Sequence, residues 1–134
     1  MSLILVDTSV LCALIDKGEQ RHQAVARFIQ SHEAEFTLLV SDYVFGETLT
    51  WVKNRFGARR AIEFGRKLRA SDFCRYYVLT PEDEAATWSI FEKYDDKAWS
   101  YTDCSCLAVV QRLALAEVLS LDAHFRQMGV QVWP

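Results

Sequence analysis

The chain has 134 residues, of which 51% are hydrophobic and 25% charged, and its formal net charge is −3. This composition indicates one soluble globular domain over residues 1–134, and the net charge is not typical of a nucleic-acid binder. The apolar runs are far too short to cross a membrane, and no secretion signal opens the chain, so we expect a cytoplasmic protein.

The first predicted element is a strand over residues 3–6, whose four apolar side chains indicate burial on both faces. Asp7 follows at once, then the hydroxyl residues Thr8 and Ser9, and helical spacing begins at Val10. Asp7 therefore lies at the carboxyl end of a central strand, where open α/β sheets place their ligand sites. Taken alone, Asp7 is better explained as a helix cap.

The next predicted elements are a helix over 20–30, a strand over 36–40 and a helix over 42–56 capped by Ser41. Glu47 lies opposite the apolar stripe of the last helix. Its neighbours at helical spacing are mostly aromatic or apolar, and none is a lysine or arginine. This setting favours a functional role for Glu47 slightly over a place at the edge of an interface.

Basic residues are concentrated between positions 55 and 69. Such a run is usually the solvated face of a helix. It is also the only concentrated basic stretch of the sequence, so Arg55, Arg59 and Arg66 are candidates for contacts with phosphate groups.

The second half of the chain continues the alternation of strands and helices. The predicted elements are a strand over 75–80, a helix opened by Pro81, a loop over 94–99, a helix capped by Ser100 or Thr102, a strand over 118–121, a short helix over 123–127 and a strand over 130–133. Asp103 lies in the first turn of its helix, where a capping box would also explain it. Asp122 follows the fourth strand as Asp7 follows the first.

This order of elements predicts an α/β fold with a parallel sheet and helices on both faces. In the doubly wound strand order 3-2-1-4-5, the first and fourth strands are neighbours, so Asp7 and Asp122 meet at the gap where the strand order reverses. Four carboxylates held together there, from Asp7, Glu47, Asp103 and Asp122, would raise each other's pKa. A divalent cation removes that penalty, and an all-oxygen cluster suits magnesium or manganese. Such a cluster can activate a water for phosphodiester cleavage.

The four cysteines and three histidines show no spacing typical of zinc ligands. We expect Cys12, Cys104 and Cys106 to be small buried apolar residues, and His22 and His32 to lie on the surface.

These acids and their neighbours resemble the PIN-domain family, and the likeness is closest to VapC-type toxin ribonucleases of toxin–antitoxin systems. It rests on Val6–Ser9, on Glu47 after Ser41, on Asp103 within Tyr-Thr-Asp-Cys, and on Leu119–Phe125, and it spans essentially the whole chain. The resemblance implies a PIN-like fold and an endoribonuclease that depends on Mg²⁺ or Mn²⁺.

The resemblance also implies roles for single residues. It casts Asp7, Glu47, Asp103 and Asp122 as catalytic acids, of which Asp7, Asp103 and Asp122 hold metal. Thr8, Ser9 and Ser120 would be supporting hydroxyls, and the basic run would contact the RNA backbone. Many members carry a second acid near Ser100 or Thr102 that this chain lacks, which leaves open whether one or two metals bind.

The family further implies a homodimer and a small antitoxin whose peptide enters the acidic groove. The four tryptophans at positions 51, 88, 99 and 133 do not all fall on predicted core stripes, and surplus aromatic surface is typical of interfaces. A PIN-domain RNA-processing nuclease without an antitoxin remains an alternative, and so does a non-catalytic RNA- or protein-binding module. A receiver domain lacks support because the first strand is followed by one acid, and a phosphatase of the Asp-x-Asp type is excluded by Ser9.

Overall fold

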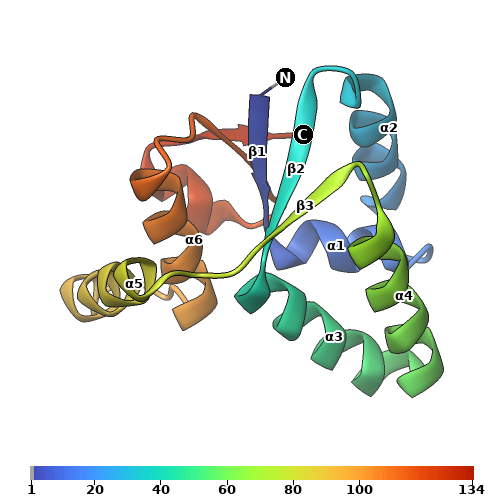
Figure 1. The fold of residues 1–134 in the computed structure, drawn as a ribbon, viewed down its shortest axis with the longest axis horizontal. Coiled ribbons are helices and arrows are strands. Elements are labelled where there is room, and N and C mark those ends of the chain that lie inside the picture. The colour runs from blue at the N-terminus through green and yellow to red at the C-terminus, as the bar shows by residue number, and fades with distance from the viewer. Residues whose placement is uncertain (1) are drawn as a thin grey trace.

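The structure, a computed structural model, describes residues 2–134, which form a five-stranded parallel sheet in the order β3-β2-β1-β4-β5 (Figure 1). The strands are β1 (Ser2–Val6), β2 (Phe36–Ser41), β3 (Cys74–Tyr77), β4 (Glu117–Leu119) and β5 (Gln131–Trp133). The predicted strand order is therefore confirmed, and β1 lies between β2 and β4 at the centre of the sheet.

Helices cover both faces of this sheet, as the sequence predicts. They are α1 (Thr8–Ile15), α2 (His22–His32), α3 (Asp42–Phe56), α4 (Ala58–Ala70), α5 (Pro81–Lys93), α6 (Tyr101–Arg112) and the 3₁₀-helix η1 (Ala123–Met128). The chain moves from β1 to β3 in one direction and then returns past β1 to β4. Because such crossovers are right-handed, α1 to α4 lie on one side of the sheet, while α5 and α6 lie on the other (Figure 1).

The core forms because the central strands are apolar on both faces. Ile4, Leu5 and Val6 of β1 are fully buried, with the apolar residues of β2 and β4 around them. A smaller cluster between α5 and α6 includes Trp99, whose indole N–H donates to Gln127 Oε1 at 2.9 Å. Among the helices of residues 2–134, none combines the length and the apolar composition needed to span a bilayer.

Two predicted strands end earlier than expected, because side chains take the place of strand partners. The strand predicted over 118–121 ends at Leu119, and the Leu121 amide donates to Ser9 Oγ at 3.0 Å. The strand predicted over 75–80 ends at Tyr77, and the Leu79 amide donates to Asp42 Oδ1 at 3.1 Å. Asp122 therefore does not follow the strand directly. Two residues separate it from the end of β4, and it caps η1.

The basic run over 55–69 is not one helix, since Gly57 separates α3 from α4 with a φ of 95°. This backbone conformation strains any residue with a Cβ, so the glycine marks the break.

The expectation for the histidines is wrong for His22 and His32, which are both half-buried. His22 Nδ1 lies 2.8 Å from the Ala13 carbonyl oxygen, and the His32 ring stacks on Phe28 with centroids 4.1 Å apart. Of the three cysteines expected to be buried, Cys104 and Cys106 are buried, whereas Cys12 is half-buried.

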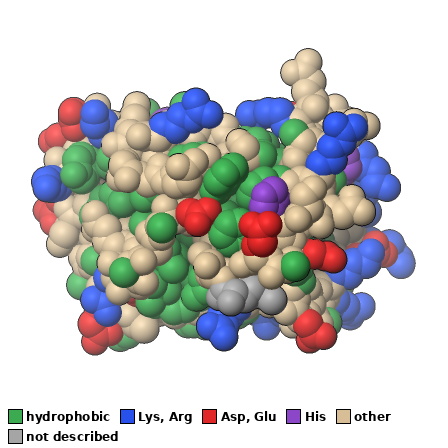
Figure 2. Space-filling model, turned by 90° about the horizontal axis from the view of Figure 1, so that it is seen from above, with side chains coloured by type: hydrophobic (Ala, Val, Ile, Leu, Met, Phe, Trp, Pro, Cys, Tyr) green, Lys and Arg blue, Asp and Glu red, His purple; other side chains and the backbone are tan. Residues whose placement is uncertain are grey.

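The two edges of the sheet differ in character. Figure 2 looks onto the edge where β1 begins, and acidic and basic side chains are dispersed over that face. The carboxyl ends of β1 and β4 lie at the opposite edge, where Asp7 and Asp122 begin the next elements. Open α/β sheets place their ligand sites at this opposite edge, outside the carboxyl ends of the strands.

Candidate active site

Asp7 is the most buried of the predicted acids, with 3% of its surface exposed. It follows β1 directly and caps α1, as the simpler prediction also had it. Its Oδ2 accepts hydrogen bonds from Ser9 Oγ at 2.7 Å and from Ser120 Oγ at 3.0 Å. Burial raises the pKa of this carboxyl, the charge of Asp103 adds to that effect, and the two serines oppose it. Hydrogen bonds from Ser9 and Ser120 therefore hold the Asp7 carboxylate in place, and a nearby cation would stabilise its ionised form.

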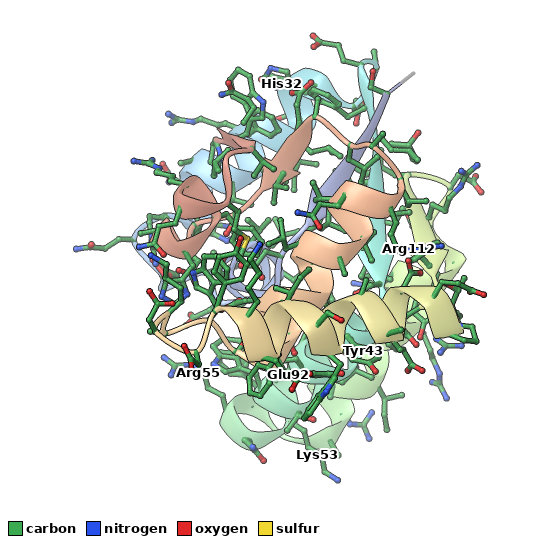
Figure 3. The ribbon with its side chains drawn as sticks, turned by 90° about the vertical axis from the view of Figure 1, so that its left-hand side faces the viewer. His32, Tyr43, Lys53, Arg55, Glu92 and Arg112 are labelled. Carbon is green, nitrogen blue, oxygen red and sulfur yellow. The ribbon has the colours of Figure 1, made fainter. Side chains whose placement is uncertain are left out.

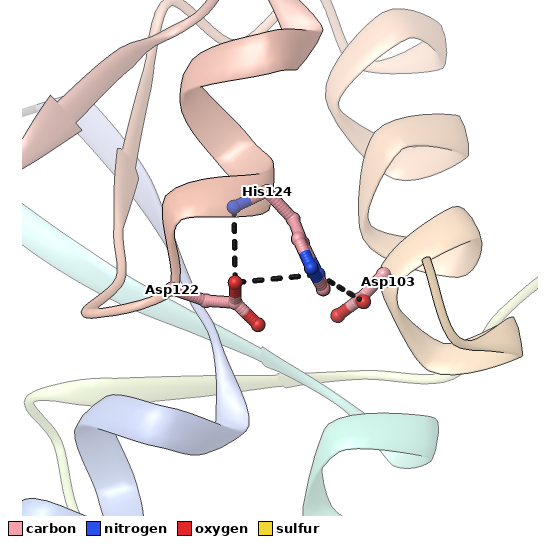
Figure 4. Close-up of side chains that lie close together, drawn as sticks. All are labelled: Asp103, Asp122 and His124. Carbon is pink, nitrogen blue, oxygen red and sulfur yellow. Dashed lines mark hydrogen bonds and ion pairs between the residues drawn. The ribbon is translucent and has the colours of Figure 1, made fainter. Parts of the chain in front are cut away.

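Asp103 and Asp122 meet at a side chain that connects them (Figure 4). His124 Nδ1 lies 3.1 Å from Asp103 Oδ2 and 3.2 Å from Asp122 Oδ1. Asp103 belongs to the capping box of α6, in which its Oδ2 accepts the Ser100 amide at 2.9 Å. Asp122 caps η1 and accepts the His124 amide at 2.9 Å. The cap positions thus fix both carboxylates at the starts of their helices.

Glu47 comes from the exposed side of α3 and approaches the same region. The buried thiol of Cys106 has its pKa raised well above the ordinary value, first by burial and then by the charges of Asp7, Asp103 and Glu47. Burial, Glu47 and Asp7 in the same way raise the pKa of Cys12 to about 12. Asp7, Asp103 and Glu47 therefore all lie close enough to Cys106 for their charges to act on its thiol, and Asp122 faces Asp103 through His124.

The hydroxyl groups predicted to support these acids differ in their contacts. Ser9 and Ser120 bind Asp7, and their oxygens lie 3.4 Å apart. Thr8 Oγ1 is buried and has no hydrogen-bond partner within residues 2–134. Because an unpaired buried hydroxyl costs free energy, a ligand or water next to Asp7 that forms a hydrogen bond with Thr8 Oγ1 would stabilise the protein.

The three arginines predicted to contact phosphate lie in different places. Arg55, at the end of α3, forms an ion pair with Asp16 at 3.3 Å and lines a cavity of about 370 Å³ that also includes Ser9 and Trp51. Arg59 and Arg66 instead line a groove on α4. Only Arg55 of the three borders a cavity that reaches a residue bound to Asp7.

Sequence reasoning missed three side chains that border the acids. Arg21 lines the cavity beside Ser9 and a second one, of about 290 Å³, that it shares with Asp122 and Arg126. Both arginines are isolated in the sequence, so no charge run marks them. His124 lies within Leu119–Phe125, a segment that carries the family resemblance, and its place two residues after Asp122 is the signal that the sequence offers.

The donor set of this site fits a divalent metal ion. The ligand atoms of Asp103, Asp122 and His124 all lie within 4.8 Å of one another, and Asp7 stands close enough to Asp103 for their charges to interact. Carboxylate oxygens are the donors that Mg²⁺ and Mn²⁺ accept, and positive charge would relieve the repulsion among the acids. Chemically, such an arrangement can polarise a phosphoryl oxygen or activate a water.

Comparison with known proteins identifies the fold family. The family model described as the PIN domain matches residues 4–131. This chain belongs to the PIN-domain family. This chain is 29% identical over 133 residues to a protein of Mycobacterium tuberculosis named 23S rRNA-specific endonuclease VapC20. The alignment covers 98% of this chain and 99% of that one. The PIN domain is also 30% identical over 123 residues to Ribonuclease VapC26 of the same organism, with 91% and 89% covered.

Solved structures agree with this assignment. The crystal structure of M. tuberculosis VapC20, described as a sarcin–ricin loop cleaving toxin, matches this PIN domain with a TM-score of 0.86 and 28% identity over 95% of each chain. FitAcB from Neisseria gonorrhoeae matches with a TM-score of 0.72 and 20% identity, covering 98% of this chain and 96% of that one, which supports the fold alone. The resemblance to VapC-type proteins inferred from the four acids is thereby confirmed.

Proposed function

We propose that this PIN domain is a metal-dependent endoribonuclease and the toxin of a toxin–antitoxin pair. The observation that carries the proposal is the convergence of Asp7, Glu47, Asp103 and Asp122, from four separate segments, at one edge of the sheet. The names of its relatives, a 23S rRNA-specific endonuclease and a ribonuclease, support RNA as the substrate class.

In this proposal Asp7, Asp103 and Asp122 hold Mg²⁺ or Mn²⁺, and Glu47 orients the attacking water from the exposed side of α3. The metal, when bound, supplies Lewis acidity and a water of lowered pKa. The protein keeps the carboxylates in position beforehand. Ser9 and Ser120 orient Asp7, and the Ser100 amide orients Asp103, so little reorganisation is required when the substrate arrives.

The RNA backbone would approach along the arginines that border the acids. Arg55 lines the cavity that includes Ser9, Arg126 lines the cavity that includes Asp122, and Arg21 lines both cavities. These cations offset the repulsion between phosphates and the acidic cluster. Arg59 and Arg66 would contact more distant phosphates along α4.

The test is cleavage of ribosomal RNA by the purified protein in Mg²⁺ or Mn²⁺, with a chelated sample as reference. We expect Asp7→Asn to abolish cleavage and Glu47→Gln to slow it on the order of 100-fold or more, because both remove a charge without changing size. The matched controls are Asp95→Asn and Glu33→Gln, which alter exposed acids on other segments and should cleave normally. Wild-type rates for Asp7→Asn would refute the assignment.

The proposed antitoxin would bind in two places. A basic side chain from its peptide would pair with the acidic cluster and compete with the metal. An apolar cavity of about 440 Å³, lined by Leu11 and Leu14 of α1 and by Phe64 and Leu68 of α4, would accept its apolar residues. Co-expression with the neighbouring small open reading frame tests this pairing. A chain that is harmless when expressed and copurifies with nothing would instead favour the RNA-processing alternative.

A further inference from the structure

The side chain of His124 contacts two acids of the candidate site. Its ring nitrogen Nδ1 faces Asp103 Oδ2 at 3.1 Å and Asp122 Oδ1 at 3.2 Å at the same time (Figure 4). The two carboxylates come from different elements, the first turn of α6 and the cap of η1. The imidazole is therefore held against both predicted metal ligands, and its side chain is still 30% exposed to solvent.

These distances are also those of neighbouring ligands around one ion. In an octahedral shell with bonds of about 2.1 Å, adjacent donor atoms lie about 3.0 Å apart. The two separations from His124 Nδ1 match that edge within about 0.2 Å, and one ligand atom of each of the three residues lies within 4.8 Å of the others, so a single ion can be shared among them.

We propose that His124 is a nitrogen ligand of the divalent metal bound by Asp103 and Asp122, and that it makes this site favour Mn²⁺ over Mg²⁺. The inference rests on the proposed function, since it concerns the same metal. It changes the predicted donor set from oxygen alone to oxygen plus one imidazole.

The preference follows from the chemistry of the donors. Mg²⁺ binds oxygen almost exclusively and keeps several of its waters, whereas first-row transition ions gain affinity from an imidazole. A site with one nitrogen donor therefore binds Mg²⁺ at a disadvantage. The backbone amide of His124 donates to Asp122 Oδ1 at 2.9 Å, which holds the histidine and this ligand in one unit.

The first experiment examines the wild-type protein loaded with Mn²⁺ by pulsed electron paramagnetic resonance. A histidine ligand produces a ¹⁴N modulation of the Mn²⁺ signal, which we expect to see and which ¹⁵N-histidine labelling should alter. In His124→Gln the modulation should disappear. His22→Gln is the matched control, because His22 is also half-buried with Nδ1 engaged, 2.8 Å from the Ala13 carbonyl oxygen, and it should keep the signal.

The second experiment measures the affinity of the protein for each metal by titration, without RNA. We expect His124→Gln to weaken Mn²⁺ binding on the order of tenfold and to change Mg²⁺ binding much less. Mn²⁺ bound without nitrogen modulation in the wild type, or an unchanged ratio of affinities in His124→Gln, would overturn this inference and leave the proposed function standing. Failure of the wild type to bind either metal would instead refute the proposed function.

Discussion

Two buried aspartates of this chain have opposite electrostatic settings. Asp7 has its pKa raised, because burial and the charge of Asp103 outweigh the hydrogen bonds from its serines. Burial would also raise the pKa of Asp83, but hydrogen bonds from Tyr77, Thr80 and Arg112 outweigh it and lower the pKa. The ion pair with Arg112, at 2.7 Å, has no counterpart at Asp7 within residues 2–134. Asp83 is thus a structural carboxylate, whereas Asp7 is left to be neutralised by a ligand.

This contrast predicts opposite effects of pH on two amide variants in the presence of a chelator. The ionised Asp7 destabilises the fold, so Asp7→Asn should melt at a higher temperature than the wild type at pH 7. The difference should vanish as the pH falls below about 4, where Asp7 is protonated in both folded and unfolded chains. The ionised Asp83 stabilises the fold, so Asp83→Asn should melt lower at pH 7, and its deficit should shrink as the pH falls. Thermal unfolding across this pH range measures both, and a lower melting temperature for Asp7→Asn at pH 7 would contradict the argument.

At the scale of elements, α5 and α6 begin with the same capping box and use it differently. Thr80 and Asp83 form the box of α5, and Ser100 and Asp103 form that of α6. In each box the hydroxyl accepts the amide of the acid, and the acid accepts the amide of the cap residue. Asp83 also forms an ion pair with Arg112, whereas Asp103 also contacts His124. One local motif therefore serves stability in α5 and the candidate site in α6.

Removing the two cap hydroxyls should separate these roles. Thr80→Ala and Ser100→Ala should each lose about 1 kcal/mol of unfolding free energy, because each leaves a helix amide without its acceptor. Only Ser100→Ala should also slow RNA cleavage, on the order of tenfold, because it loosens a carboxylate proposed to hold metal. Denaturant unfolding and cleavage rates at a temperature where both variants are folded give the comparison. An equal loss of activity in the two variants would show that the effect is one of stability alone.

Large aromatic side chains stay exposed on α5, the helix nearest the viewer in Figure 3. Trp88 is 54% exposed and Phe91 41% exposed. Their rings lie 6.0 Å apart, and the series continues to Tyr101 at 5.4 Å from Phe91 and to Tyr43 at 6.1 Å from Tyr101. Of the four tryptophans, which do not all fall on predicted core stripes, Trp88 is the exposed one, since Trp99 is buried and the other two are half-buried. Large exposed aromatic surfaces are typical of protein interfaces.

We expect this surface to join two copies of the chain in a homodimer. Trp88→Lys should convert the dimer to a monomer, because burying an unpaired ammonium in an apolar interface is strongly unfavourable. Analytical ultracentrifugation at micromolar concentration measures the change. Ile62→Lys is the control, since Ile62 is 52% exposed on α4 and should leave the dimer intact. A wild-type monomer, or a dimer that survives Trp88→Lys, would exclude this face as the contact.

Sequence patterns predict those parts of the fold that depend on local chemistry. The apolar run before Asp7 marks the central strand, and Ser41 and Pro81 mark helix starts that the structure reproduces. The contact of His124 with Asp103 could not be predicted, because it depends on how η1 packs against the first turn of α6, which no local sequence pattern indicates. The strand ends were misplaced for a related reason, since Ser9 and Asp42 accept hydrogen bonds from segments distant in sequence.

The pairing of β1 with β4 also determines when the site forms during protein synthesis. Ser120 binds Asp7 across 113 positions, and the chain between them includes β2, β3, β4 and six helices. Because a nascent chain folds from its amino-terminal end as it leaves the ribosome, Asp7 and Glu47 emerge long before Asp122 and His124. An unfinished chain therefore has the first acids without the last, and a prematurely terminated one never completes the set. For an enzyme proposed to cleave RNA, this order of synthesis delays activity until residues 118–124 have emerged.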